Sequence, residues 1–265
     1  MNLALRIIIL KIGSSSITHG CERGISYKIL NQLAAATETL RDAGYKVIIV
    51  TSGAMRLGLA KLGRETIPSQ DTVSFKQALT AVGQIELMDA YKEVFKHYDA
   101  HVGQVLVTHK GLDDTERNET IGRTLTKMFE IDIIPVVNAN DTVSSQELIF
   151  GDNDSLSARI AVLLKADRLI ILSDVEGLYD KDPNIHKDAK LIQEVRNISA
   201  DIKSMANDTS SSSGMGGMRS KIEAVQICIE NQIPVDILSV TKVNKIPELV
   251  INQVKNLGTH FIINT

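Results

Sequence analysis

Residues 5–16 read LRIIILKIGSSS, an apolar run that holds one lysine, Lys11, near its end and passes into a glycine-serine turn. Apolar residues that follow one another without alternation are typical of a strand buried on both faces, as in a parallel sheet covered by helices. Similar runs follow at residues 46–51, 102–108, 133–138, 168–173 and 235–239. We therefore expect residues 5–12 and these five runs to form the buried strands of one mainly parallel sheet.

Helical patterns separate these runs. Apolar residues recur at helical spacing from Ile29 to Leu40 and stop at Gly44, a residue suited to a helix C-terminus. The same pattern covers residues 154–165 and 221–231, and shorter peripheral strands are predicted at residues 148–150 and 190–195. Residues 256–263 form a final apolar run. Strands that alternate with helices imply right-handed crossovers. The predicted fold class is α/β, a three-layer αβα sandwich with a mainly parallel central sheet, in a single domain of residues 1–265.

Composition excludes several classes of protein. Of the 265 residues, 43% are apolar and 23% charged, as in an average soluble domain. The net charge of −3 and the 4% of aromatic residues argue against a nucleic-acid-binding protein. The apolar runs are far shorter than the about 20 residues of a membrane span, and no signal peptide is recognisable. We therefore expect a protein that binds neither nucleic acid nor membrane. Because Cys21 and Cys228 lie far apart and form no CxxC motif, we expect it to be cytoplasmic.

Polar residues follow four of the predicted strands. In an open parallel sheet, ligands bind beyond the carboxyl ends of the strands. Turn and cap chemistry alone explains any one such loop. Four such loops at one edge favour a ligand site. The lysine in the first of them supports it, because burying a lysine in a strand is costly unless its ammonium reaches an anion or water. The four segments are Lys11 to Ser16, Thr51-Ser52-Gly53-Ala54, Asn138-Ala139-Asn140-Asp141 and Ser173-Asp174.

The segment 214–221, Gly-Met-Gly-Gly-Met-Arg-Ser-Lys, also favours an anion site. Three glycines ahead of a helix let backbone amides approach an anion, and Lys221 adds a positive charge. The alternative is a flexible linker that ends in a solvated lysine. The Walker, EF-hand, zinc and GxSxG patterns are all absent from the chain.

Taken in order, these segments resemble the motifs of the amino-acid kinase family over nearly the whole chain. The resemblance implies a carbamate kinase-like fold, in which residues 1–165 mainly bind substrate and residues 166–265 mainly bind ATP. It is carried by Lys11-Ile12-Gly13-Ser14-Ser15, Val50-Thr51-Ser52-Gly53-Ala54, Ala81-Val82-Gly83-Gln84, residues 138–143, Gly151-Asp152-Asn153-Asp154, Ser173-Asp174, Gly177-Leu178-Tyr179 and Gly216-Gly217-Met218 through Lys221.

Within the family, the motifs are most similar to the branch that uses ATP to phosphorylate the γ-carboxylate of L-glutamate, the first step of proline synthesis. The resemblance implies that Lys11 and Lys221 neutralise the phosphates and that Asp154 holds both lysines. It implies no protein ligand for a metal, since Mg²⁺ is carried by the ATP phosphates. The implied glutamate ligands are Ser52, Asp141 and Asn153, and the implied ATP-binding residues are Lys11, Ser173, Asp174, Met215, Gly216, Gly217, Met218, Arg219, Ser220 and Lys221.

The residues present suit this chemistry. A γ-carboxylate is already ionised at neutral pH, so its phosphorylation needs no general base. Phosphoryl transfer then depends on alignment and on neutralising the charge of the transferred group. The family often has Thr at the position of Met215 and Ser or Thr at the positions of Arg219 and Ser220, so the chain departs from it at Met215 and Arg219.

The resemblance also carries expectations about regulation and assembly. Many relatives append an RNA-binding-type PUA domain that this sequence lacks, and we expect the 265 residues to be an active kinase without it. We further expect feedback inhibition by proline, a homo-oligomer, and glutamyl phosphate reductase as a partner.

Two alternatives remain open. The first is another kinase of this fold, acting on N-acetylglutamate, aspartate, carbamate or UMP. Asp141 and Asn153 favour a free amino acid, whereas a UMP kinase needs arginines for the substrate phosphate. The second is a non-catalytic amino-acid sensor, which the presence of both Lys11 and Lys221 disfavours.

Overall fold

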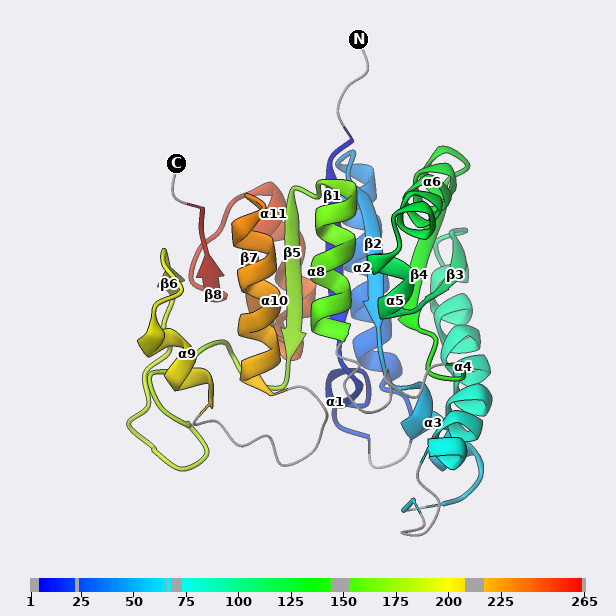
Figure 1. The fold of residues 1–265 in the computed structure, drawn as a ribbon, viewed down its shortest axis with the longest axis horizontal. Helices are drawn as coiled ribbons and strands as arrows, with labels where there is room; N and C mark the ends of the chain where they lie inside the picture. The colour runs from blue at the N-terminus through cyan, green and yellow to red at the C-terminus, as the bar shows by residue number, and fades with distance from the viewer. Residues whose placement is uncertain are drawn as a thin grey trace.

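The central sheet orders its strands β3-β4-β2-β1-β5-β7-β8-β6 (Figure 1). The computed structural model describes residues 5–21, 24–64, 66–67, 73–143, 153–207 and 217–263. Neighbouring strands are parallel from β3 to β7, whereas β8 runs antiparallel to β7 and pairs in parallel with β6. The prediction of a mainly parallel sheet is confirmed. The strands are β1 Ile7–Ile12, β2 Lys46–Thr51, β3 His101–Val107, β4 Ile133–Ala139, β5 Arg168–Ser173, β6 Glu194–Val195, β7 Val235–Ser239 and β8 Gly258–Phe261.

Helices cover both faces of this sheet. The first face carries α2, α4, η1 and α11, and the second carries α5, α6, α8, α9 and α10 (Figure 1). This arrangement confirms the three-layer αβα fold. The helices are α1 Ser14–Ile17, α2 Tyr27–Asp42, α3 Ala54–Lys61, α4 Val73–Lys96, α5 His109–Asp113, α6 Thr115–Glu130, α8 Asn153–Leu164, α9 Ala200–Asn207, α10 Met218–Glu230, the 3₁₀ helix η1 Val240–Lys245 and α11 Ile246–Ile251.

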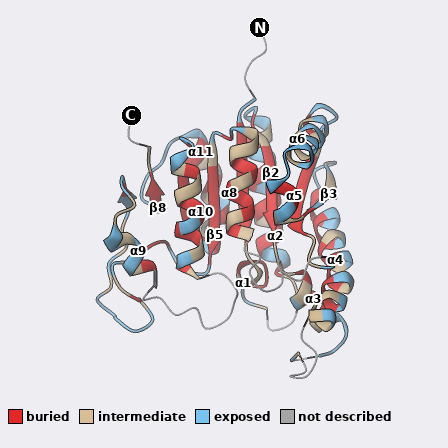
Figure 2. Ribbon diagram, in the orientation of Figure 1, coloured by how far each residue is buried: buried red, intermediate tan, exposed pale blue. Residues whose placement is uncertain are grey.

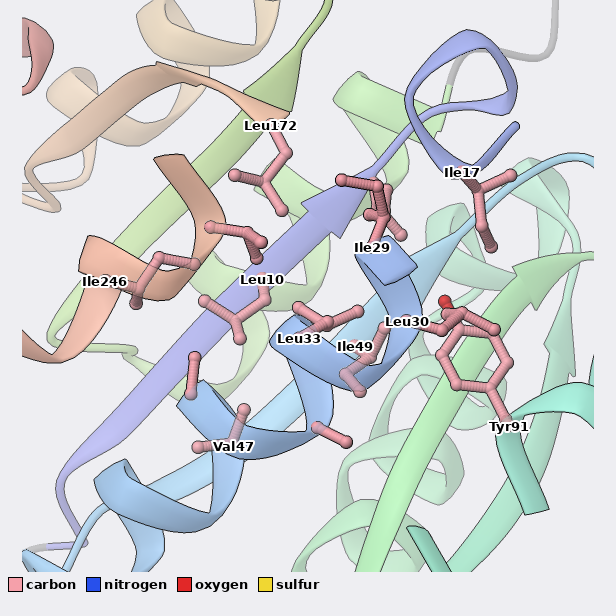
Figure 3. Close-up of a cluster of buried hydrophobic side chains, with 14 of the residues drawn as sticks. Leu10, Ile17, Ile29, Leu30, Leu33, Val47, Ile49, Tyr91, Leu172 and Ile246 are labelled. Atoms are coloured by element: carbon pink, nitrogen blue, oxygen red, sulfur yellow. The ribbon is translucent and has the colours of Figure 1, made fainter. Parts of the chain in front are cut away.

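The hydrophobic core lies on both faces of the sheet, and the central strands of the sheet, such as β1, β2 and β5, are almost wholly buried (Figure 2). Successive side chains of a strand point to opposite faces. Leu10 and Ile49 pack against Leu33 of α2 on the first face (Figure 3), and Ile7 and Ile9 pack on the second. By the same alternation, Lys11 of β1 points to the same face as Ile7 and Ile9, which is the face covered by α8 and α10.

One strand differs from the prediction. The sequence predicts burial on both faces for the run at 102–108, but β3 lies at the edge of the sheet and Val107 is its only buried residue. The prediction of burial is wrong because β3 has a single neighbour, β4. An apolar run predicts that a strand forms, but it does not predict how many strands lie beside it.

The shorter predicted strands have different outcomes. The run 256–263 contains β8, and 190–195 contains only the two-residue β6 and a bridge from Leu191 to Tyr179. Residues 148–150 lie outside the described part of the chain. None of the helices in that part combines the length and hydropathy that a membrane span requires.

Candidate active site

The carboxyl ends of β1, β2, β4 and β5 meet at one edge of the sheet, where α1 also lies (Figure 1). The polar segments that follow these four strands therefore come together, as the sequence predicts. A sharp turn leaves β2 through Gly53, whose φ of 107° lies in the left-handed region. A residue with a Cβ would be strained there, so glycine allows α3 to begin directly after the strand.

Lys11, Asp154 and Lys221 form a buried ionic cluster at this edge. Lys11 comes from β1, Asp154 from the first turn of α8 and Lys221 from the first turn of α10. Lys11 Nζ forms an ion pair with Asp154 Oδ1, and Lys221 Nζ lies 3.2 Å from Asp154 Oδ2. The three residues are 5%, 0% and 7% exposed. The predicted grouping of both lysines around Asp154 is present in the structure.

The electrostatics of the cluster keep Asp154 ionised. Burial alone favours the neutral carboxylic acid, but the ammonium groups of Lys11 and Lys221 and a hydrogen bond from Ser220 outweigh it and hold the pKa of Asp154 well below its usual range. Two ammonium groups and one carboxylate sum to one positive charge. The cluster therefore suits a ligand that brings negative charge to this edge.

The predicted ATP-binding residues at the start of α10 have different surroundings. Ser220 Oγ donates to Asp154 Oδ2 at 2.9 Å, so this side chain joins the ionic cluster. Met218 is buried in the core beneath the helix, and Arg219 points outward to an exposed ion pair with Glu223 at 2.9 Å. Gly217 is the N-cap of α10 and provides no side-chain hydrogen bond to it. Met215 and Gly216 lie outside the described residues.

Beside the ionic cluster, Ser52 and Asn153 form a hydrogen-bonded pair. Asn153 Nδ2 lies 2.6 Å from Ser52 Oγ and 2.6 Å from the carbonyl oxygen of Thr51. It also lies 2.9 Å from Asn138 Oδ1. Asn153 and Asp154 are adjacent at the start of α8, so one helix terminus supplies both the amide group and the carboxylate of the ionic cluster.

The remaining predicted residues lie at the same edge of the sheet. Asp141 is half-buried in the turn after β4. Ser173 ends β5 and is buried, and its hydroxyl donates to Asp174 Oδ1 at 3.2 Å. Asp174 is exposed. The described residues contain no group of three or more His, Cys, Asp or Glu side chains placed to hold a metal ion.

Two residues near the site were given no role by the sequence reasoning. Asn138, the sixth residue of β4, and Gln84 of α4 are both buried and hydrogen-bonded to each other. The available signals were an asparagine that ends an apolar run and the segment Ala81-Val82-Gly83-Gln84. Neither signal predicts the hydrogen bond between Asn138 and Gln84, because the two residues are remote in sequence.

An open, mainly parallel sheet that gathers two buried ammonium groups around one carboxylate defines an α/β protein whose candidate site suits an anionic ligand. The chain belongs to the amino acid kinase family, whose model matches residues 6–239.

The chain is similar over most of its length to several bacterial relatives. It is 40% identical to the glutamate 5-kinase of Clostridium acetobutylicum, over 96% of this chain and 94% of that protein. It is 36% identical to the glutamate 5-kinase of Lactococcus lactis subsp. lactis, over 98% of this chain and 96% of that protein. The identity to glutamate 5-kinase 2 of Bacillus subtilis is 42%, over 87% of this chain but 61% of that longer protein.

Solved structures support the fold. The carbamate kinase of Giardia lamblia bound to AMP-PNP superposes with a TM-score of 0.67 at 13% identity, covering 98% of this chain and 99% of that one. The UMP kinase of Ureaplasma parvum gives a TM-score of 0.63 at 15% identity, covering 98% of this chain and 100% of that one. At these identities the likeness extends to the fold alone.

Proposed function

We propose that this protein transfers the γ-phosphoryl group of ATP to the γ-carboxylate of L-glutamate, forming γ-glutamyl phosphate for proline synthesis. The observation that carries the proposal is the buried Lys11–Asp154–Lys221 cluster, which adjoins the Ser52–Asn153 pair at one sheet edge. Sequence identity of 36–40% with glutamate 5-kinases, over nearly the whole of both chains, supports the choice of substrate.

In the proposed reaction, Lys11 and Lys221 meet the charge of the transferred group. In the transition state the transferred phosphoryl group carries negative charge on its equatorial oxygens, and preorganised cations stabilise that charge without reorganisation. Asp154 holds both ammonium groups in place and remains ionised while it does so. Glutamate needs no general base, because its γ-carboxylate is already a nucleophile at neutral pH.

Ser52, Asp141 and Asn153 are the proposed ligands of glutamate. An α-amino acid presents an ammonium group, which requires acceptors, and a carboxylate, which requires donors. Asp141 supplies a carboxylate for the ammonium, and the Ser52 hydroxyl supplies a donor. On this view residues 1–165 mainly bind substrate and residues 166–265 mainly bind nucleotide.

ATP and Mg²⁺ are the proposed cofactors, and the described residues fit a triphosphate. A Cβ at Gly13 would lie 3.4 Å from Lys11 Nζ, so glycine keeps the space beside this ammonium open. The N-cap of α10 is Gly217, which has no side chain to bond to the first backbone N–H groups of the helix. These N–H groups suit a phosphate. Ser173, Asp174 and residues 215–221 are the proposed contacts. Mg²⁺ would be held by the phosphate oxygens of the nucleotide, where it would neutralise part of their charge.

We also propose proline as a feedback inhibitor, because proline carries the same adjacent ammonium and carboxylate that Asp141 and Asn153 recognise in glutamate. A homo-oligomer is proposed from the family resemblance. Glutamyl phosphate reductase is the proposed partner, since the product is a reactive mixed anhydride. A cytoplasmic location accords with two free cysteines, of which Cys228 is buried, raising the pKa of its thiol to about 12.

Hydroxylamine tests the activity, because it converts acyl phosphates to hydroxamates, which form a coloured complex with ferric iron. The purified chain is incubated with ATP, Mg²⁺ and hydroxylamine, and glutamate is compared with aspartate and N-acetylglutamate. We expect the highest kcat/KM with glutamate. A Lys11→Met variant purified in parallel controls for contaminating host kinase. Equal or faster turnover of N-acetylglutamate contradicts the assignment, because acetylation removes the ammonium that Asp141 recognises.

A further inference from the structure

The segment Ala81-Val82-Gly83-Gln84 has no part in the proposed reaction, yet the structure brings it to the site. It lies in α4, which is in backbone contact with α3. A Cβ at Gly83 would lie 1.7 Å from the carbonyl oxygen of Ala54 and 2.4 Å from the backbone nitrogen of Gly58. Glycine therefore permits the close approach of the two helices. Gln84, the next residue, is thereby held against the carboxyl end of β4.

Gln84 takes part in a buried chain of three amide side chains. Its Oε1 accepts a hydrogen bond from Asn138 Nδ2 at 2.8 Å. Asn138 Oδ1 in turn accepts from Asn153 Nδ2 at 2.9 Å. Gln84 is 8% exposed and Asn138 is 2% exposed, so water does not compete freely for these bonds. The chain thus connects α4 to the proposed glutamate ligand at the start of α8.

Chemistry determines the direction of each amide in this chain. The backbone N–H of Ala139 can only donate, so the Asn138 atom 2.9 Å from it is the oxygen. Consequently Asn138 turns its nitrogen to Gln84, whose contacting atom must be an oxygen. At the other end, the carbonyl oxygen of Thr51 can only accept, so the Asn153 atom 2.6 Å from it is the nitrogen.

This direction decides what the site offers to a substrate. The two N–H hydrogens of Asn153 are committed to Thr51, Ser52 and Asn138. Among the described residues, no donor contacts Asn153 Oδ1, which remains to accept from a ligand. Ser52 Oγ accepts from Asn153 and keeps its own O–H to donate. The pair therefore presents one acceptor and one donor, the complement of an ammonium and a carboxylate.

Gln84 also carries a cost that this role explains. Its Nε2 is buried and has no hydrogen-bond partner among the described residues. A buried donor without a partner is destabilising, and an apolar side chain of similar size would avoid the penalty. The bond that Gln84 Oε1 does make gives the buried amide nitrogen of Asn138 its acceptor, and it fixes Asn138 together with the N–H of Ala139. The structure therefore retains a glutamine where packing alone favours a leucine or methionine.

We propose that Gln84 is a positioning residue that determines specificity, acting through Asn138 to hold the Asn153 oxygen toward the substrate's ammonium. The proposal rests on the proposed function and names the group within the substrate that is selected. Without an acceptor at Gln84, the buried amide nitrogen of Asn138 loses its partner, and only the N–H groups of Ala139 and Asn153 still hold the Asn138 oxygen. Asn138 is then fixed less firmly, and so is the amide nitrogen of Asn153 that bonds to it. The preference for a dicarboxylate with an ammonium over one without it falls.

The test compares glutamate with glutarate, which lacks the ammonium. Dissociation constants of both are measured by isothermal titration calorimetry for the wild type and for Gln84→Met, Gln84→Glu and Thr80→Val. Gln84→Met removes the acceptor at similar volume, and Gln84→Glu keeps an acceptor but removes Nε2. Thr80 lies one turn earlier on α4, is 2% exposed and has an Oγ1 without a partner among the described residues, so it controls for effects of burial.

We expect the preference for glutamate over glutarate to fall about tenfold in Gln84→Met, the loss of one charge-assisted hydrogen bond. Gln84→Glu and Thr80→Val keep the preference, and kcat at saturating glutamate stays within about twofold of wild type in Gln84→Met. An unchanged preference in Gln84→Met overturns the proposal, as does equal loss in Gln84→Glu, which would assign the effect to direct contact by Nε2. A wild type that does not discriminate between the two acids refutes the proposed function instead.

Discussion

Replacing Asp154 by asparagine tests the ionic cluster most directly. The substitution preserves shape but removes the negative charge that pairs with both Lys11 and Lys221. Asp154 is fully buried, and both lysines are more than nine-tenths buried. Breaking a buried ion pair by removing one partner costs about 3–5 kcal/mol, because a charge remains without compensation. Here two ammonium groups lose their counter-ion.

The expected loss is large enough to measure by two methods. Urea titration should show the free energy of unfolding reduced by about 3–5 kcal/mol. At about 2–4 °C per kcal/mol for a domain approaching this size, Tm should fall by about 6–20 °C. Glu223→Gln on α10 is the control, since it breaks the exposed ion pair with Arg219. We expect it to change stability by no more than about 0.5 kcal/mol.

The dependence on pH gives an independent check with a defined sign. In the folded protein the pKa of Asp154 lies below its unfolded value because Lys11 and Lys221 favour the charged form despite burial. Its contribution is therefore complete above the unfolded pKa of about 3.9 and is lost as the pH falls through the lowered folded pKa. The difference in stability between wild type and Asp154→Asn should be constant from about pH 5 to 8 and shrink below about pH 4. A loss under about 1 kcal/mol at pH 7, or a gap that does not narrow in acid, refutes the electrostatic reasoning.

Three further predictions concern activity. Lys11→Ala and Lys221→Ala should each lower kcat by about 10²–10³ while raising the glutamate KM less, because both cations act on charge in the transition state; near-normal kcat in both variants would leave the lysines with a structural role only. Asp141→Asn should raise the glutamate KM about 10–150-fold with an unchanged ATP KM, as expected for losing a charge-assisted hydrogen bond of about 1.5–3 kcal/mol. A lower Tm with unchanged KM would show that Asp141 only stabilises its turn. Proline should inhibit competitively at subsaturating glutamate, and full activity at high proline contradicts a shared subsite at Asp141 and Asn153.

Local patterns in the sequence predicted the central strands and several helices correctly. Continuous apolar runs indicated β1, β2, β4, β5 and β7, and helical spacing indicated α2, α8 and α10. The long α4 was not predicted, although it carries Gln84. Its buried residues include Thr80, Gly83 and Gln84 as well as apolar side chains, so its buried face is not uniformly apolar. Close packing against α3 through glycine, rather than an apolar stripe, positions that part of the helix.

Residue types and strand patterns identified the side chains with the chemistry for a site, but only the packed fold brings particular ones into contact. Lys11 was conspicuous because it interrupts a buried strand, and strand direction placed it at the ligand-binding edge. Its contact with Asp154 and Lys221 depends on the sheet order, which sets α8 and α10 against the same face of β1. The same order places β3 at the edge, although its apolar run resembles that of β4. Periodicity records the environment along one segment, whereas contacts between remote segments arise only when all strands and helices pack together.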